Sequence, residues 1–214
     1  MKLLMYTLLV LINTACGNET KEITQQEITY ATPVEVPTQD GMERAYFASG
    51  CFWCVEEIYE NVQGVSESIS GYSGGTMQNP TYRNHGNHAE ANEIIYDPNK
   101  VSFKTLVDVY FASQNIEQVN GQGPDIGKAY RSIIFYQNDE QKQIIQNKIE
   151  ALTKEGYKVA AEVKAFQKFW VAEDYHQDYA RLHPNNSYIQ NISIPRFNRF
   201  AAKMPEVIKK NGSH

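Results

Sequence analysis

Residues 46–62 read YFASGCFWCVEEIYENV, an apolar stretch that ends at a glycine and is followed by two cysteines with two aromatic residues between them. The residues before the glycine, Glu43 to Ser49, have the composition of a strand, and Gly50 opens a turn. Apolar residues then follow at helical spacing, namely Val55, Ile58, Tyr59 and Val62. The stretch therefore predicts a strand, a turn and a helix, with Cys51 near the helix start and Cys54 one turn along.

The same alternation of strand and helix signals continues along the chain. Helices are predicted to begin at Ser102 and near Asn138, since each is a good N-cap followed by apolar residues at helical spacing. Further strands are predicted at 65–71, 89–96, 131–136 and 159–164. Residues 182–200 have no strong periodicity and are expected to be coil. These elements predict an α+β two-layer sandwich, with a mixed sheet packed by helices and a long coil C-terminal segment.

The composition is that of one ordinary globular domain with extensions. The chain has 214 residues, of which 42% are hydrophobic and 21% are charged. The net charge is -5 and the basic residues are scattered, so no nucleic acid partner is expected. We predict a monomer whose catalytic domain spans 43–202, followed by a polar tail at 203–214.

The first sixteen residues, MKLLMYTLLVLINTAC, have the layout of a secretory signal. The apolar run from Leu3 to Ile12 is too short for a stable transmembrane helix, which makes a membrane-spanning anchor the weaker interpretation. Cys16 resembles the lipidated cysteine of a bacterial lipoprotein, although Asn13 departs from the usual aliphatic residue, and simple cleavage and release is the alternative. Residues 17–42 are polar and predict a flexible tether. We therefore expect export to the bacterial cell envelope or periplasm, with a lipid anchor on Cys16.

Three kinds of site are compatible with the CxxC spacing. The positive end of a helix stabilises a thiolate, so Cys51 is a candidate nucleophile, and a CxxC pair at a helix start can close into a disulfide with Cys54. Two buried core cysteines are the second possibility. A zinc site is the third, but it needs two more ligands, and His85 and His88 are spaced more tightly than is usual. No metal is predicted.

Five blocks of sequence resemble the A class of peptide methionine sulfoxide reductases. They are GCFWCVE, GYSGG, NPTY, NHAEANEIIYDP and GPDIGKAYRS, and they occur in family order between Glu43 and Pro184. The resemblance implies a compact two-layer α+β domain that reduces the S epimer of methionine sulfoxide, in proteins or as the free amino acid. It also implies no bound cofactor and an external thiol reductant such as thioredoxin.

Two other functions remain open from the sequence. One is a general thiol-disulfide oxidoreductase of the cell envelope, which would use the CxxC pair but would not require an acid and two tyrosines around it. The other is a lipid-anchored binding module without catalysis.

The resemblance assigns a role in catalysis to four residues. Reduction of a sulfoxide requires a soft nucleophile at sulfur and an acid at oxygen. Cys51 corresponds to the nucleophile and Glu90 to the acid, which an apolar pocket would keep protonated near neutral pH. The hydroxyl groups of Tyr82 and Tyr130 correspond to the groups that assist the acid.

Four more residues correspond to the substrate-binding part of the site. Phe52 and Trp53 resemble the aromatic pair that holds the S-methyl group, and core packing is the alternative interpretation of both rings. Asp125 corresponds to a residue that binds substrate or orders the site, and a turn-forming aspartate would look the same. His88 is expected to support the neighbouring loop.

The sequence departs from the family pattern in two places. The position of Cys54 is often glycine in the family, whose resolving cysteines commonly lie near the C-terminus, and no cysteine follows Cys54 here. Cys54 is then the sole candidate to condense with a sulfenic acid on Cys51. The segment YRNHGNHAE is also shorter than the corresponding loop of many relatives, which leaves substrate contacts from that loop in doubt.

Overall fold

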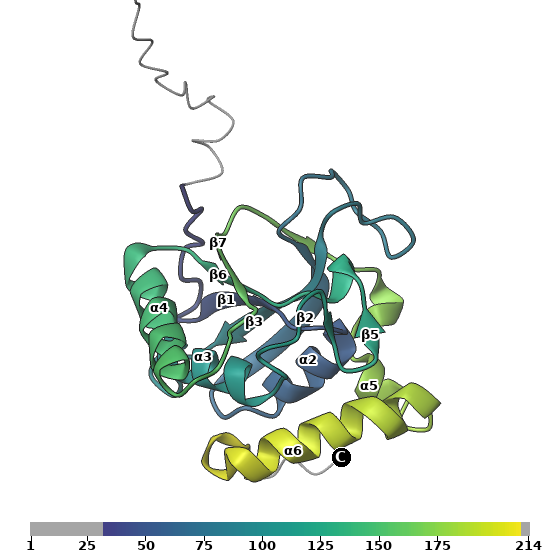
Figure 1. Cartoon of the computed structure of the whole chain (residues 1–214). Helices are drawn as coiled ribbons and strands as arrows, with labels where there is room; N and C mark the ends of the chain where they lie inside the picture. The colour runs from purple at the N-terminus through teal and green to yellow at the C-terminus, as the bar shows by residue number, and fades with distance from the viewer. Residues whose placement is uncertain (1–31, 211–214) are drawn as a thin grey trace, which may run out of the picture.

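The computed structural model describes residues 32–210. A six-stranded mixed sheet lies at the centre of the domain that they form (Figure 1). In spatial order its strands are β7 (Glu162–Ala165), β6 (Ile133–Tyr136), β1 (Glu43–Ala48), β3 (Ala89–Tyr96), β2 (Val65–Ser73) and β8 (Phe169–Val171). Neighbouring strands run antiparallel except for β6 and β7, which are parallel. The predicted α+β class is confirmed.

Helices cover one face of this sheet. They are α2 (Phe52–Glu60), α3 (Phe103–Ala112), α4 (Asp139–Lys154) and α6 (Ile194–Lys203). Apolar residues of all four helices form one buried cluster with strand residues such as Phe47 and Ile94. Ser102 and Asn138 cap α3 and α4 as predicted, since their side chains accept hydrogen bonds from the backbone N–H groups of Thr105 and Gln141.

The opposite face of the sheet packs against loops. Tyr46 points to this face and its ring stacks on Phe166 at 3.7 Å between ring centroids. The segment 32–42 also lies against the domain, because Val34 donates its backbone N–H to the carbonyl of Phe166 and Val36 packs on the same cluster. The predicted tether at 17–42 therefore contacts the folded domain at Val34 and Val36, and its residues 17–31 lie outside the described residues.

The C-terminal segment is helical, and the coil predicted for 182–200 is wrong. A short helix α5 (Tyr179–Leu182) and a π-helical turn at Ile189–Ser193 lead directly into α6. Asparagine, serine and proline have low helix propensity, but Phe197, Phe200 and Met204 lie at helical spacing and pack on the core, so an amphipathic pattern was present in the sequence and was missed. The turn widens just before Pro195, whose ring cannot continue the regular hydrogen-bond ladder. Figure 1 shows α6 lying across one end of the domain.

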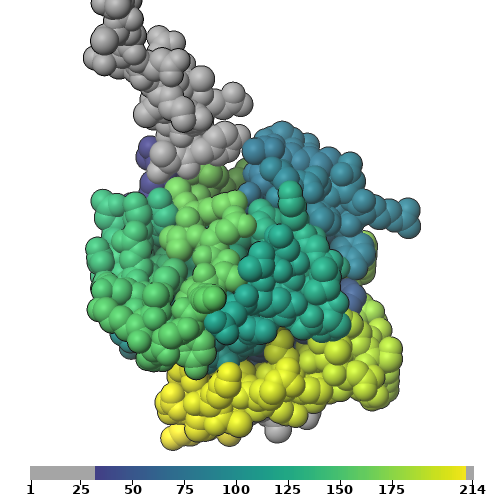
Figure 2. Space-filling model, viewed as in Figure 1, coloured from purple at the N-terminus to yellow at the C-terminus, as the bar shows by residue number. Residues whose placement is uncertain are grey.

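The predicted polar tail begins as part of the folded domain. A 3-10 turn at Pro205–Val207 follows α6, and Val207 accepts a backbone hydrogen bond from Gln63. Lys209 donates its backbone N–H to Asn61, so the chain is held as far as this residue. In the space-filling view the C-terminal helices form a continuous band along this side (Figure 2).

The predicted signal at 1–16 and its Cys16 lie outside the described residues. Within residues 32–210, no helix combines the length and the apolar character needed to cross a membrane.

Candidate active site

A glycine turn between β1 and α2 places Cys51 at the start of the helix. Gly50 has a φ of 84°, a backbone conformation that favours glycine. A Cβ atom at this position would also lie 2.5 Å from the Cβ atom of Gln122, so no larger residue fits. Cys51 is the N-cap of α2, and both it and Cys54 are buried free thiols, with 7% and 1% of their surfaces exposed.

A cavity of about 180 Å³ opens over Cys51. Its lining contains seven residues that the sequence predicts, together with one that it does not: Cys51, Phe52, Trp53, Tyr82, Glu90, Asp125, Tyr130 and Tyr188. These side chains come from α2, β3, the loop after β2, the segment around β5 (Asp125–Ile126) and the π-helical region. Two predicted residues, Cys54 and His88, do not line this cavity.

Glu90 is the buried acid of the cavity. It lies on β3 opposite Tyr72, is only 3% exposed, and its Oε2 atom accepts a hydrogen bond from the backbone N–H of Phe52 at 3.0 Å. Burial raises the pKa of Glu90 to about 8, and the neighbouring charges of Asp125 and Cys54 act in the same direction. Glu90 is therefore mostly protonated at neutral pH and can donate a proton.

The two thiols titrate as a hydrogen-bonded pair. Burial raises the pKa of Cys51 well above its usual range, with further contributions from Cys54 and Glu90. The hydrogen bond from Cys51 lowers the pKa of Cys54 to about 7, and the positive charge of Arg196 acts in the same direction. The first negative charge therefore rests on Cys54. This differs from the expectation that the helix start favours a thiolate on Cys51, because burial dominates the pKa of Cys51 and its side chain accepts no capping hydrogen bond from the helix.

The aromatic residues between the cysteines are held from behind by two residues that the sequence analysis missed. Trp53 stacks on Tyr179 with 3.8 Å between ring centroids, and its indole N–H donates to Nδ1 of His176 at 3.2 Å. His176 also contacts the rings of Phe52 and Tyr82. Both residues belong to the short sequence YHQDY after β8, whose close spacing of aromatic rings was the available signal. Phe52 and Trp53 thus form one wall of the cavity in fixed orientations.

Tyr82 and Tyr130 present hydroxyl groups to the same cavity. Burial raises the pKa of both tyrosines, and the charge of Glu90 is the next contribution in each case. Both hydroxyl groups therefore remain protonated and can donate hydrogen bonds. Glu173 fixes the loop of Tyr82, since its carboxylate accepts from the backbone N–H of Tyr82 at 3.0 Å and from the hydroxyl of Tyr72 at 3.1 Å.

His88 supports the loop before β3 and does not reach the cavity. Its Nδ1 atom accepts from the backbone N–H of Gly75 at 3.1 Å, which leaves Nε2–H to donate to the carbonyl of Met77 at 2.8 Å. A Cβ atom on Gly75 would lie 2.4 Å from the backbone nitrogen of His88, so the close contact requires glycine. The expected loop-supporting role agrees with these contacts, whereas a direct substrate contact does not.

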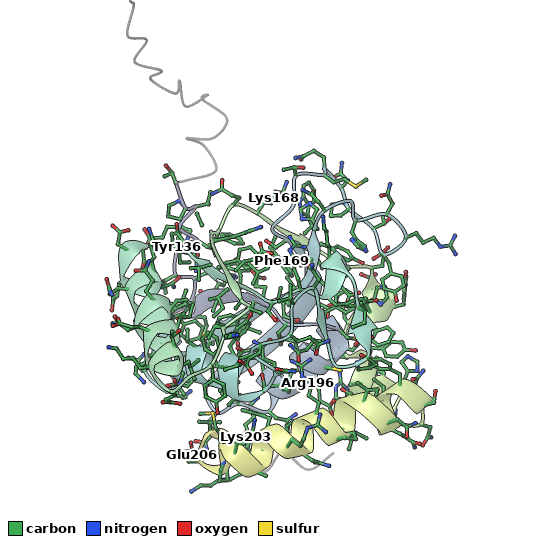
Figure 3. All side chains as sticks on the ribbon, in the orientation of Figure 1. Tyr136, Lys168, Phe169, Arg196, Lys203 and Glu206 are labelled. Carbon is green, nitrogen blue, oxygen red and sulfur yellow. The ribbon has the colours of Figure 1, made fainter. Side chains whose placement is uncertain are left out.

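Arg196 connects the C-terminal helix to the cysteine turn and was also missed from the sequence. Its buried guanidinium donates to the carbonyl groups of Ser113 and Ser49, at 2.8 and 2.9 Å, and to the hydroxyl of Ser49 at 3.0 Å. Figure 3 shows this side chain reaching from α6 into the body of the domain. A hollow of about 430 Å³ lined by both Arg196 and Cys54 lies on this side of the cysteine pair.

The assembled groups can carry out a two-electron reduction at sulfur. One small cavity combines the thiol of Cys51, a protonated carboxyl group, phenol donors and an aromatic wall, and the second thiol, Cys54, lies directly behind it. Among residues 32–210, no three histidine, cysteine, aspartate or glutamate side chains are grouped so as to hold a metal ion.

Comparisons with known proteins agree with this chemistry. A family model described as peptide methionine sulfoxide reductase matches residues 43–207. Peptide methionine sulfoxide reductase MsrA 1 of Rhodopirellula baltica is 41% identical over 185 residues, which cover 84% of this chain and 96% of the relative. MsrA of Pasteurella multocida is 41% identical over 172 residues, covering 78% and 99% of the two chains.

Solved structures show the same similarity in three dimensions. Methionine sulfoxide reductase A of Corynebacterium diphtheriae superposes with a TM-score of 0.62 at 28% identity, covering 74% of this chain and 85% of that one. Reduced Mxr1 of Saccharomyces cerevisiae superposes with a TM-score of 0.63 at 26% identity, covering 71% and 91%.

Proposed function

Because the chain belongs to the A class of peptide methionine sulfoxide reductases and is an oxidoreductase that reduces methionine sulfoxide, we propose how its own residues perform the reaction. The observation that carries the proposal is the buried carboxyl of Glu90, whose pKa of about 8 keeps it protonated in the cavity that also holds Cys51. Thiol-disulfide exchange has no departing oxygen, so it does not require an acid at this position.

In the first step the sulfoxide binds with its methyl group against Phe52 and Trp53 and its oxygen toward Glu90. Cys54 accepts the proton of Cys51, and the resulting thiolate attacks the sulfoxide sulfur while Glu90 protonates the oxygen. The oxygen ends on Cys51 as a sulfenic acid, and methionine leaves. Cys51 is thereby oxidised by two electrons and the sulfoxide is reduced by two.

In the second step Cys54 attacks the sulfur of the sulfenic acid and water leaves. The product is a Cys51–Cys54 disulfide, which a thioredoxin-like dithiol reduces to regenerate the enzyme. The enzyme acts as a monomer on the S epimer, in oxidised proteins or as the free amino acid, and repairs oxidative damage.

An assay with resolved epimers tests the substrate. We expect methionine to form from an N-blocked methionine S-sulfoxide with dithiothreitol as reductant, and the R epimer to react at least about tenfold more slowly, because only one epimer can direct oxygen to Glu90 while its methyl group contacts the aromatic wall. Reduction of a small mixed disulfide is measured in parallel. Equal rates with both epimers, or disulfide exchange without methionine formation, would contradict the proposal.

The location of the enzyme is a separate part of the proposal. Export and lipidation at Cys16 rest on the leader-like sequence MKLLMYTLLVLINTAC alone. The full chain expressed in a bacterium should partition with membranes, and Cys16→Ala should remove the acyl groups and release it from them. Intact mass spectrometry of the mature chain decides the matter, since an unlipidated N-terminus elsewhere would refute the anchor. Cys16→Ala should retain sulfoxide reduction.

A further inference from the structure

Two hydrogen bonds connect Cys54 to the far wall of the substrate cavity. The sulfur of Cys54 lies 3.9 Å from the hydroxyl oxygen of Tyr188, within hydrogen-bonding range for sulfur, and donates to it once Cys54 has taken the proton of Cys51. The hydroxyl of Tyr188 in turn donates to Oδ2 of Asp125 at 2.5 Å. The donors of both bonds point the same way, from sulfur to phenol to carboxylate.

Tyr188 and Asp125 also form the partition between the two hollows beside the cysteine pair. Both residues line the 180 Å³ cavity that contains Cys51 and the 430 Å³ hollow that contains Cys54. A proton that travels along the two hydrogen bonds therefore leaves the Cys54 side and arrives in the cavity of Cys51.

We propose that Tyr188 and Asp125 form a proton relay for the closure of the Cys51–Cys54 disulfide. The inference rests on the proposed function, because closure follows sulfenic acid formation on Cys51. Disulfide closure needs a base at Cys54 and an acid at the departing hydroxyl, and the relay supplies both.

The proton and electron balance of the step is complete. The S–H bond of Cys54 breaks, its proton passes to Tyr188, and the phenol proton of Tyr188 passes to Asp125. The sulfur of Cys54 forms a bond to the sulfur of Cys51 as the S–O bond of the sulfenic acid breaks. Asp125 then protonates the departing hydroxyl, which leaves as water, so no further oxidant or reductant is required.

Other polar groups near the relay do not offer the same path. The charged and titratable neighbours from the surrounding elements are Cys51, Tyr82, Glu90, Tyr130 and Arg196. Arg196 has no acceptor atom. Ser193 also bonds to Cys54, but its hydroxyl donates to Glu57, which does not line the cavity of Cys51. Among residues 32–210, Tyr188 is the hydroxyl that is hydrogen-bonded both to Cys54 and to an acid lining the cavity of Cys51.

Competition between closure and chemical trapping measures the step. The sulfenic acid is generated on the full enzyme with hydrogen peroxide, in the presence of dimedone, and mass spectrometry gives the ratio of disulfide to dimedone adduct. The variants are Tyr188→Phe, which keeps the ring, and Asp125→Asn, which keeps an acceptor for the tyrosine but cannot take its proton. Tyr157→Phe, at an exposed tyrosine elsewhere, is the matched control.

We expect both variants to lower the closure rate about tenfold or more at about pH 6. Hydroxide replaces the relay at high pH, so the difference in closure rate between parent and variant should shrink by about fivefold or more at about pH 9. The double variant should close no more slowly than the slower single variant, because both residues act in one path. Three results would overturn the relay. The closure rate could fall by less than about fivefold in either variant, or by the same factor at both pH values. The two effects could also multiply in the double variant.

Methionine release from a sulfoxide substrate is measured on the same samples. The parent enzyme could release no methionine while disulfide closure driven by peroxide still depends on Tyr188. This result would contradict the proposed function and support the relay. Methionine release with closure that is independent of Tyr188 would contradict the relay alone.

Discussion

We expect Cys51→Ser to form no methionine from a sulfoxide substrate, and Cys54→Ser to form one equivalent per enzyme and then stop. A serine at position 51 has no sulfur to accept the oxygen, so the first step is lost. A serine at position 54 leaves Cys51 and Glu90 in place, so one turnover is completed, although more slowly because the proton acceptor is gone. Methionine released per enzyme without added reductant distinguishes the two variants.

The recycling of Cys54→Ser provides the second part of this test. A thioredoxin-like reductant attacks disulfides, and the variant cannot form one between its two positions. Steady-state turnover with such a reductant should therefore fall by about 10²-fold or more, while dimedone should label Cys51 in most of the enzyme. Recycling at the parent rate would show that Cys54 is not the resolving thiol.

The architecture around the cysteine pair could be predicted because its signals are local. The helix caps at Ser102 and Asn138 and the strand at 89–96 follow from the residues in each segment, and the structure confirms all three. α6 was missed although Phe197, Phe200 and Met204 lie at helical spacing, whereas the bonds of Arg196 to Ser49 and Ser113 could not be predicted. These partners are distant in sequence.

The same distinction applies to the site. The blocks that resemble the family contain seven of the eight residues that line the cavity over Cys51, and the eighth, Tyr188, lies in the segment that was predicted to be coil. The charge on the cysteine pair could not be predicted either. It depends on the burial of both thiols, on the hydrogen bond between them and on the positive charge of Arg196.

Glu90→Gln should slow methionine formation in a single turnover by about 10²-fold or more, the range of general acid catalysis. The amide is nearly isosteric and can still accept the hydrogen bond from the backbone N–H of Phe52, so the fold should be retained. Glu67→Gln removes an exposed carboxylate from β2 and is the matched control. An unchanged single-turnover rate in Glu90→Gln would refute the acid role.

The pH dependence of the same step identifies the proton donor. Loss of the first proton from the cysteine pair, near the Cys54 pKa of about 7, activates the nucleophile, so the rate should rise through that pH. Glu90 donates only while it is protonated, so the rate should fall as the pH rises through about 8. In Glu90→Gln the rising limb should remain and the falling limb should disappear. A falling limb that persists in the variant would assign the proton to another group, and the cavity also holds the hydroxyl groups of Tyr82, Tyr130 and Tyr188.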